Sequence, residues 1–199
     1  MDYVRNTMTD APQSAETYFE GQMLLAMPAM TDPRFERAVI YMCAHSDEGA
    51  MGLVINKTLD SIDFRKLLGQ LDITPGASTP KIAVHFGGPV ENQRGFVLHS
   101  SEYRHDETLM IDERVGLTAT LDILRALARG DGPERSILAL GYAGWGPGQL
   151  ETEMHDNAWL SVPFDDELMF RVGHEQKWER AFNSIGVDLS VLSGSAGRA

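Results

Sequence analysis

The stretch Ser136-Ile-Leu-Ala-Leu-Gly-Tyr-Ala-Gly-Trp-Gly-Pro-Gly148 decides the fold class of this chain of 199 residues. Residues 136–140 form a continuous apolar run, which is typical of a strand buried on both faces. The glycine-rich run 141–148 follows at once, and residues 149–157 have the composition of a helix. A buried strand followed by a glycine-rich turn and a helix indicates an α/β protein.

The rest of the chain repeats this alternation of short strands and helices. Period-two and continuous apolar runs predict strands at 22–27, 38–45, 50–56, 81–86, 94–99, 108–111 and 158–162, of which the second and third form a hairpin. Period-3.6 runs predict helices at 61–71 with Ser61 as N-cap, between Thr118 or Thr120 and Gly130, at 149–157 and at 175–185. We therefore expect an α/β fold in which a single-domain mixed β-sheet is flanked by helices, as an αβα-type sandwich.

The expected domain organisation is simple. Residues 1–18 are polar and acidic without a sustained period and predict a flexible N-terminal arm, and residues 19–197 predict one domain without an interior linker. Cys43 is the one cysteine, so no intramolecular disulfide forms, and the polar start lacks the apolar core of a secretory signal. These features predict a cytoplasmic protein.

The net charge limits the classes of partner. There are 29 acidic and 17 basic side chains, which give −12, and such a chain repels the phosphates of nucleic acid and the headgroups of anionic lipid. No apolar run approaches the roughly 20 residues of a membrane-spanning helix. We expect no nucleic-acid partner, no membrane association and no cofactor.

The glycine-rich run does not match a known phosphate loop. Gln149 occupies the place of the last glycine of a dinucleotide fingerprint, and no Gly-Lys-Ser/Thr occurs anywhere in the chain. Two alternatives stay open: an anion or small-ligand site at this loop, or a structural turn around a packed Trp145.

Cys43 and His45 are the candidate catalytic residues. Two residues apart on one expected strand, they should face the same side, where an imidazolium lowers the pKa of a thiol and makes it a better nucleophile. The alternative is a small apolar core cysteine beside a histidine. His85 and His99 flank one turn, but a metal site needs three or four ligands, and the chain has no HExxH or CxxC, so no metal site is expected.

Six blocks of sequence resemble the AlgH/YqgE family of bacterial proteins. The match runs in order from about residue 19 to residue 197. The resemblance implies a compact single-domain α/β protein of the bacterial cytosol, includes Cys43 and His45, and suggests through the family's name a regulatory role. The blocks are Gly21-Gln-Met-Leu-Leu-Ala-Met-Pro28, Asp32-Pro-Arg-Phe35, Gly49-Ala-Met-Gly-Leu-Val-Ile-Asn56, Gly87-Gly-Pro-Val90, Gly141-Tyr-Ala-Gly-Trp-Gly-Pro-Gly-Gln-Leu-Glu151 and Asn157-Ala-Trp-Leu160.

The function expected is small-ligand binding or regulation without direct DNA contact. The alternatives are an enzyme or redox sensor that uses Cys43 near His45, and a transcriptional regulator, as the family name suggests. Acidic clusters beside the turns favour a neutral or cationic ligand, or a protein partner with a basic face. The predicted ligand-binding residues are Asn56, Gly87, Gly88, Pro89, Gly144, Trp145, Gly146 and Gln149.

Overall fold

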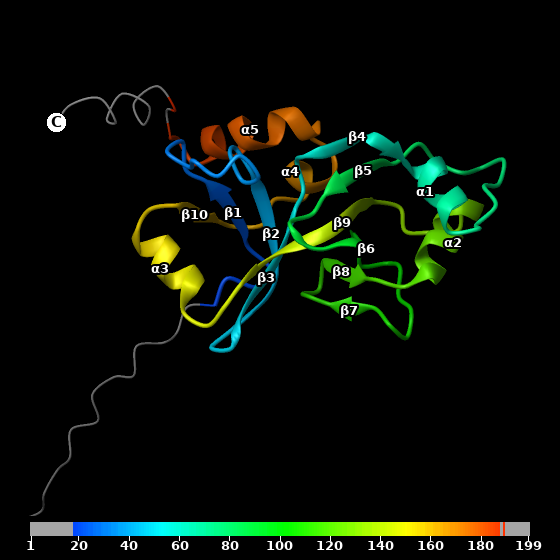
Figure 1. Ribbon diagram of the computed structural model, residues 1–199, viewed down its shortest axis with the longest axis horizontal. Coiled ribbons are helices and arrows are strands. Elements are labelled where there is room, and N and C mark those ends of the chain that lie inside the picture. The colour runs from blue at the N-terminus through cyan, green and yellow to red at the C-terminus, as the bar shows by residue number, and fades with distance from the viewer. Residues whose placement is uncertain (1–17, 188, 190–199) are drawn as a thin grey trace, which may run out of the picture.

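The computed structural model describes residues 18–187 and 189, so all but one residue of the expected arm at 1–18 lies outside the described part. The chain is a mixed α/β protein (Figure 1). Its strands are β1 Met23–Ala26, β2 Val39–Ser46, β3 Gly49–Val54, β4 Thr58–Asp63, β5 Ala83–Phe86, β6 Val90–Ser100, β7 Leu109–Met110, β8 Val115–Thr118, β9 Ser136–Trp145 and β10 Trp159–Val162. Its helices are α1 Phe64–Gln70, α2 Leu121–Arg129, α3 Gln149–His155, α4 Asp166–Phe170 and α5 Lys177–Ser184, with the 3-10 turn η1 His174–Gln176 before α5.

The ten strands form one branched sheet in the order β10-β1-β2-β3-β9-β6-β8-β7, with β5 on β9 and β4 on β5. The pairing of β5 with β9 is parallel, and every other strand pair of the described residues is antiparallel. The expected class, a mixed sheet with helices, is therefore confirmed. Its finer form, a regular αβα sandwich, stays a prediction.

Strand β9 joins the two halves of the sheet because it changes partners along its length. Residues 138–140 pair with β5 and residues 143–145 pair with β3, while β6 pairs with β9 from Ser136 to Tyr142. The change occurs at Gly141, which has a φ of +72°. The glycine-rich run thus lies mostly inside a strand, and only residues 146–148 form the turn that was expected for the whole run.

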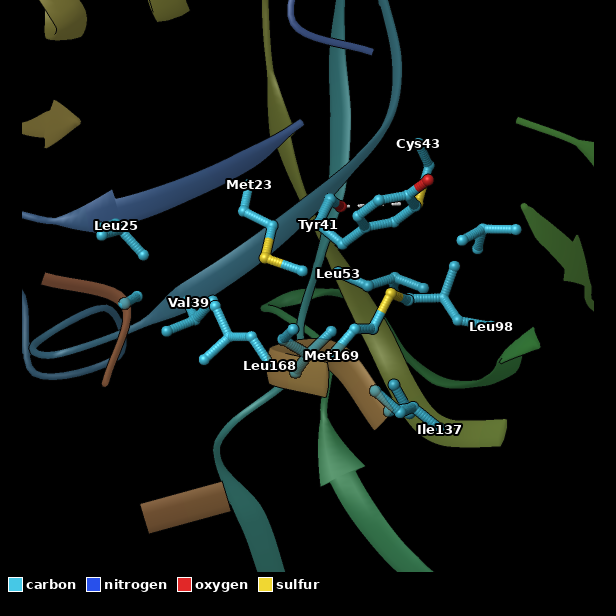
Figure 2. Packing of buried hydrophobic residues seen from close by; sticks show 14 of the residues in the cluster. Met23, Leu25, Val39, Tyr41, Cys43, Leu53, Leu98, Ile137, Leu168 and Met169 are labelled. Atoms are coloured by element: carbon cyan, nitrogen blue, oxygen red, sulfur yellow. Dashed lines mark hydrogen bonds between the residues drawn. The ribbon is translucent and has the colours of Figure 1, made fainter. Parts of the chain in front are cut away.

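The helices cover three apolar clusters. In the largest cluster, α4 and α5 pack on β1, β2 and β3 through Leu168, Met169, Trp178 and Phe182. Figure 2 shows Leu168 and Met169 together with strand residues of this cluster. In the second cluster α1 and α2 share the far end of the molecule (Figure 1). In the third cluster α3 contributes Leu150 beside Trp145 and Trp159.

Several local predictions differ from the structure. Residues 58–63 form strand β4, so the helix predicted from residue 61 begins at Phe64, and Asp63 rather than Ser61 is its N-cap, with the Lys66 N–H donating to its side chain. The segment before α2 forms β8, and α2 begins after Thr120 and ends at Gly130 in the left-handed conformation. Helix α4 was not predicted, because five residues are too few to show a period.

Candidate functional site

The carboxylate of Glu153 ties the end of β9 to helix α3. Its Oε2 accepts hydrogen bonds from two indole nitrogens, Trp145 Nε1 at 2.9 Å and Trp159 Nε1 at 2.7 Å. Both tryptophans are buried, and their rings meet edge to face with centroids 5.9 Å apart. One carboxylate therefore satisfies two indole donors that would otherwise be buried without a partner.

Gln149 completes this network at the turn that follows β9. Its side chain accepts from the Gly146 N–H at 3.0 Å and donates to Glu153 Oε1 at 2.8 Å. Gly148 has a φ of +70°, and a Cβ at this position would meet no atom within 4 Å. Glycine is therefore favoured here by the left-handed backbone conformation and not by lack of space. Trp145, Gly146 and Gln149 of the predicted site are thus together, and each is engaged within the chain.

A β-bulge separates Cys43 from His45. The register of β2 on β3 shifts between Met42 and Ala44, so that Cys43 is the extra residue. Cys43 lies in the largest core cluster, whereas His45 faces α3. The expectation that the two side chains share a face assumed unbroken alternation, and the bulge contradicts it.

His45 links the beginning of the described chain to α3. Its Nδ1 accepts a hydrogen bond from the Phe19 N–H at 3.0 Å, and its ring stacks on Phe19 with centroids 5.4 Å apart. Because Nδ1 is an acceptor, the ring proton lies on Nε2, which donates to Glu151 Oε1 at 2.6 Å. Both ring nitrogens are occupied, and neither is free to take a proton from a substrate.

The Cys43 thiol is buried in the core. Its Sγ lies 3.6 Å from the Tyr41 carbonyl oxygen, to which it donates, as Figure 2 shows. Burial raises the pKa of this thiol well above its ordinary value. This environment favours the neutral thiol, which is a poor nucleophile.

The predicted glycines at 87 and 88 pack against the backbone of β9. A Cβ on Gly87 would lie 2.2 Å from the Gly141 carbonyl oxygen, and a Cβ on Gly88 would lie 2.0 Å from the Tyr142 carbonyl carbon. The Gly87 N–H donates to Leu140 and its carbonyl accepts from Val54, which bridges β9 and β3. These two glycines are therefore required by a close approach, and the group that approaches them is the backbone of β9 rather than a ligand.

Asn56 and the turn after β9 lie at opposite ends of β3. The Asn56 side chain accepts from the Val39 N–H and donates to the Arg37 carbonyl, both at 2.8 Å, just beyond the end of β3. Trp145 pairs with Ala50 near the other end, about 20 Å away at the rise of a strand. The predicted ligand-binding residues therefore lie in three places: at Asn56, at the joint where residues 87–89 pack on β9, and in the Trp145 network. The structure does not bring them to one pocket.

The rings of two other histidines, His85 and His99, are also hydrogen-bonded within the chain. His85 Nδ1 contacts the Leu138 carbonyl at 3.2 Å, and burial lowers its pKa to about 4. His99, on β6, contacts Thr118 Oγ1, on β8, through its Nε2 at 2.9 Å. No group of three potential metal ligands occurs among the described residues, and no helix within them is long and apolar enough to cross a membrane.

A shallow depression of about 400 Å³ lies beside the Trp145 network, between the hairpin of β2 and β3 and the end of β9. Met51, Tyr142 and Val90 supply its larger apolar side chains, and exposed Gly144 lies among them. Glu48 is the one charged residue in its lining. Of the predicted ligand-binding residues, Gly144 and Trp145 border it.

Glu151, Glu153 and Trp159 were missing from the predicted site. The Glu-x-Glu pair at 151 and 153 lies on a short helix directly after the glycine-rich turn, and Glu153 follows Gln149 by four residues, which places both on one helix face. That spacing was available in the sequence. Glu151 bonds to His45, while His155, four residues after Glu151, lies against Asp156 at the surface.

Comparisons with known proteins agree on one family. The AlgH-like family profile matches residues 23–190. A UPF0301 protein of Rhodospirillum rubrum is 53% identical over 187 residues, covering 94% of this chain and 97% of the relative, and one of Nitrobacter hamburgensis is 54% identical over 199 residues, covering 96% and 91%. The solution structure of the AlgH protein from Pseudomonas aeruginosa is 43% identical, with a TM-score of 0.76 over 95% of this chain and 100% of that one. A crystal structure of a Corynebacterium diphtheriae protein, 21% identical over 87% of this chain and 90% of that chain, shares the fold with a TM-score of 0.70. Because the family profile spans most of its length, the chain belongs to the AlgH-like family.

Proposed function

We propose that this protein acts by binding, and that it takes a neutral or cationic small ligand in the depression between the β2–β3 hairpin and the end of β9. The observation that supports this most is the lining of the depression, which joins an apolar floor to one carboxylate, Glu48. Ligand sites are typically concave and largely apolar with a few polar groups that fix orientation. The absence of a lining cation disfavours an anionic ligand at this place.

The scaffold around the depression supports a preformed site. Trp145, at its edge, is fixed by Glu153, and the strand that carries Gly144 is paired with β3 through Met51. A site built on paired strands loses little conformational freedom when a ligand binds. Regulation would follow if ligand binding changes what this face presents to a partner.

The catalytic alternative has little support in the side-chain geometry. The Cys43 thiol is buried with a raised pKa, and both nitrogens of His45 are occupied. Alkylation of the folded protein over a range of pH tests this directly. We expect the thiol to react only on unfolding, and rapid alkylation near neutral pH would support the enzyme or redox-sensor hypothesis.

A second candidate, regulation through a protein partner at the same face, is favoured by Val90, which is 37% exposed at the edge of the depression. The net charge of −12 favours partners with a basic face over DNA. The single cysteine agrees with action in the bacterial cytoplasm. A specific mobility shift of duplex DNA at physiological salt would contradict action without DNA contact.

A thermal-stability screen tests the ligand hypothesis. A ligand that binds only the native state raises the melting temperature in a concentration-dependent way. We expect hits among neutral and cationic metabolites, and we expect Ala44→Arg, on the exposed rim of the depression, to abolish them. Glu48→Gln should weaken the cationic hits alone, while the exposed control Glu107→Gln should change none. A screen without hits, or hits that survive Ala44→Arg, would overturn the proposed site.

A further inference from the structure

A second concave surface lies at the other end of the molecule, beside α1. It is a groove of about 540 Å³ between the first turn of α1 and the segment that leads into β5. Pro80 and Ile82 supply its accessible apolar walls, and Phe64, which also borders it, is only 1% exposed. Phe64 belongs to the second core cluster and Ile82 packs against it, so the groove opens onto the edge of a hydrophobic core.

The charged side chains around this groove are mostly cationic. Arg65 and Lys66 border it from α1, and Lys81 borders it from the segment before β5, against one carboxylate, Asp63. Asp63 is already engaged, because it caps α1 and lies 3.9 Å from Lys66. Within the described residues, Arg65 and Lys81 have no ion pair or side-chain hydrogen bond.

Two unpaired cations on one apolar groove are unusual in a chain with such an excess of acids. Elsewhere arginines such as Arg34, Arg114 and Arg125 lie against a neighbouring carboxylate. A net charge of −12 supplies carboxylates over most of the surface, yet none besides Asp63 lines this groove. The charges that line the groove, three cations and one carboxylate, thus have the opposite balance to that of the whole chain.

We propose that this groove binds a small amphipathic anion, with the apolar body of the ligand on Pro80 and Ile82 and its carboxylate or phosphate head between Arg65 and Lys81. The volume of the groove lies within the range of small-molecule sites. Because its walls are apolar, the ligand needs an apolar part as well as a negative charge. This site is separate from the depression beside Trp145 and has the opposite charge preference. Either proposal can fail without the other.

Titration of the full chain with decanoate, followed by backbone amide spectra, tests the proposal. We expect saturable shifts centred on Phe64, Arg65, Lys81 and Ile82. Decanol has the same apolar chain without the charge and should bind at least about tenfold more weakly, and acetate, which has the charge without the chain, should cause no saturable shift. Shifts centred elsewhere, no shifts, or equal binding of decanol would overturn the proposal.

Charge reversal separates anion recognition from nonspecific apolar binding. Arg65→Glu and Lys81→Glu change exposed side chains, so neither should disturb folding, which far-ultraviolet circular dichroism verifies. The double variant should weaken decanoate binding about tenfold, the effect of losing about 1.4 kcal/mol. The matched control Arg171→Glu, an exposed arginine outside the groove lining, should leave affinity within about twofold.

An acidic protein partner is the competing occupant. A synthetic peptide of alternating Glu and Leu residues, titrated under the same conditions, represents it. If this peptide displaced decanoate and bound the same residues more tightly, the groove would be a peptide-docking site and the small-anion proposal would be wrong. Unchanged decanoate affinity in the double variant would also overturn it.

Discussion

Replacing Glu153 by alanine should destabilise the protein more than any other single change to an acidic side chain of α3. The substitution removes the acceptor shared by Trp145 Nε1 and Trp159 Nε1, whose residues are 7% and 4% exposed. A buried donor left without a partner costs about 1–3 kcal/mol. Two such donors, partly relieved by water because Glu153 itself is only half-buried, give an expected loss of about 2–4 kcal/mol in the free energy of unfolding.

Urea unfolding measures this loss. With a dependence on urea of about 2 kcal/mol per molar, the midpoint should fall by about 1–2 M. Far-ultraviolet circular dichroism is the appropriate signal, because the substitution itself changes the fluorescence of two tryptophans. Glu153→Gln keeps a carbonyl oxygen for the indoles and should lose less than about half as much. Glu107→Ala, an exposed carboxylate, should lose less than about 0.5 kcal/mol. If Glu153→Ala were as stable as Glu107→Ala, the two indoles would not depend on this carboxylate.

Three further predictions concern the joint, the buried histidine and the His45 link. Gly88→Ala forces a Cβ into the backbone of β9 and should lower the free energy of unfolding by more than about 3 kcal/mol or prevent folding. Gly148→Ala has free space around it and should cost only about 1 kcal/mol, the strain of a left-handed alanine. Melting temperatures of the two variants compare these costs, and equal effects would refute the close contact at Gly88. Burial lowers the pKa of His85 to about 4 in the folded protein, whereas in the unfolded chain its pKa is about 6.5. As the pH falls below about 6.5, the unfolded chain therefore binds a proton at His85 that the folded protein does not yet bind. The free energy of unfolding should thus fall by up to about 3 kcal/mol between pH 6.5 and 4, and His85→Asn should lose that part of the slope in urea titrations. His45→Phe keeps the aromatic stack but removes both hydrogen bonds, so hydrogen exchange of the Phe19 amide should accelerate by at least about tenfold, and unchanged exchange would contradict the link.

The apolar pattern was sufficient to predict most of the sheet. The hairpin of β2 and β3, the strand at 136–140 and the glycine end of α2 all follow from local physics, because burial, turn residues and a left-handed glycine leave direct marks in the sequence. The failure at residues 58–63 has a tertiary cause. Four of these six residues are polar, and the apolar Leu59 and Ile62 are three apart and so show no period-two pattern. Strand β4 forms at the edge of the sheet by pairing with β5, which no local signal predicts.

The site was less predictable than the sheet for a related reason. Side-chain direction along a strand follows from alternation only while the register is unbroken, and the bulge at Cys43 inverts it for every later residue of β2. A reactive pair inferred from two positions on one strand thus became a core thiol and a histidine that faces α3. The partner of that histidine, Glu151, was more than one hundred residues away, and only the packing of α3 on the hairpin identifies it.

Glycine-rich segments have a similar ambiguity. A run of glycines often marks a place where another group comes close to the backbone. The sequence looks the same whether that group is a phosphate or the backbone of another strand. At Gly87, Gly88 and Gly141 the approaching group is backbone, which explains why the run lacks the spacing of a phosphate loop although it follows a buried strand. The residues that bear on ligand binding are then those whose chemistry the fold leaves unused.

The distinction between charges that are paired within the chain and charges left unpaired also changes the interpretation of the net charge of −12. Glu151 and Glu153 stand beside the glycine-rich turn, but both are committed to hydrogen bonds, so Glu48 is the carboxylate left to the depression. Beside α1 the unused charges are Arg65 and Lys81, in spite of the acidic total. Because an exposed ion pair already satisfies its members, ligand preference follows the unpaired groups at each concave surface. Two sites of opposite preference on one acidic chain are therefore consistent with its composition.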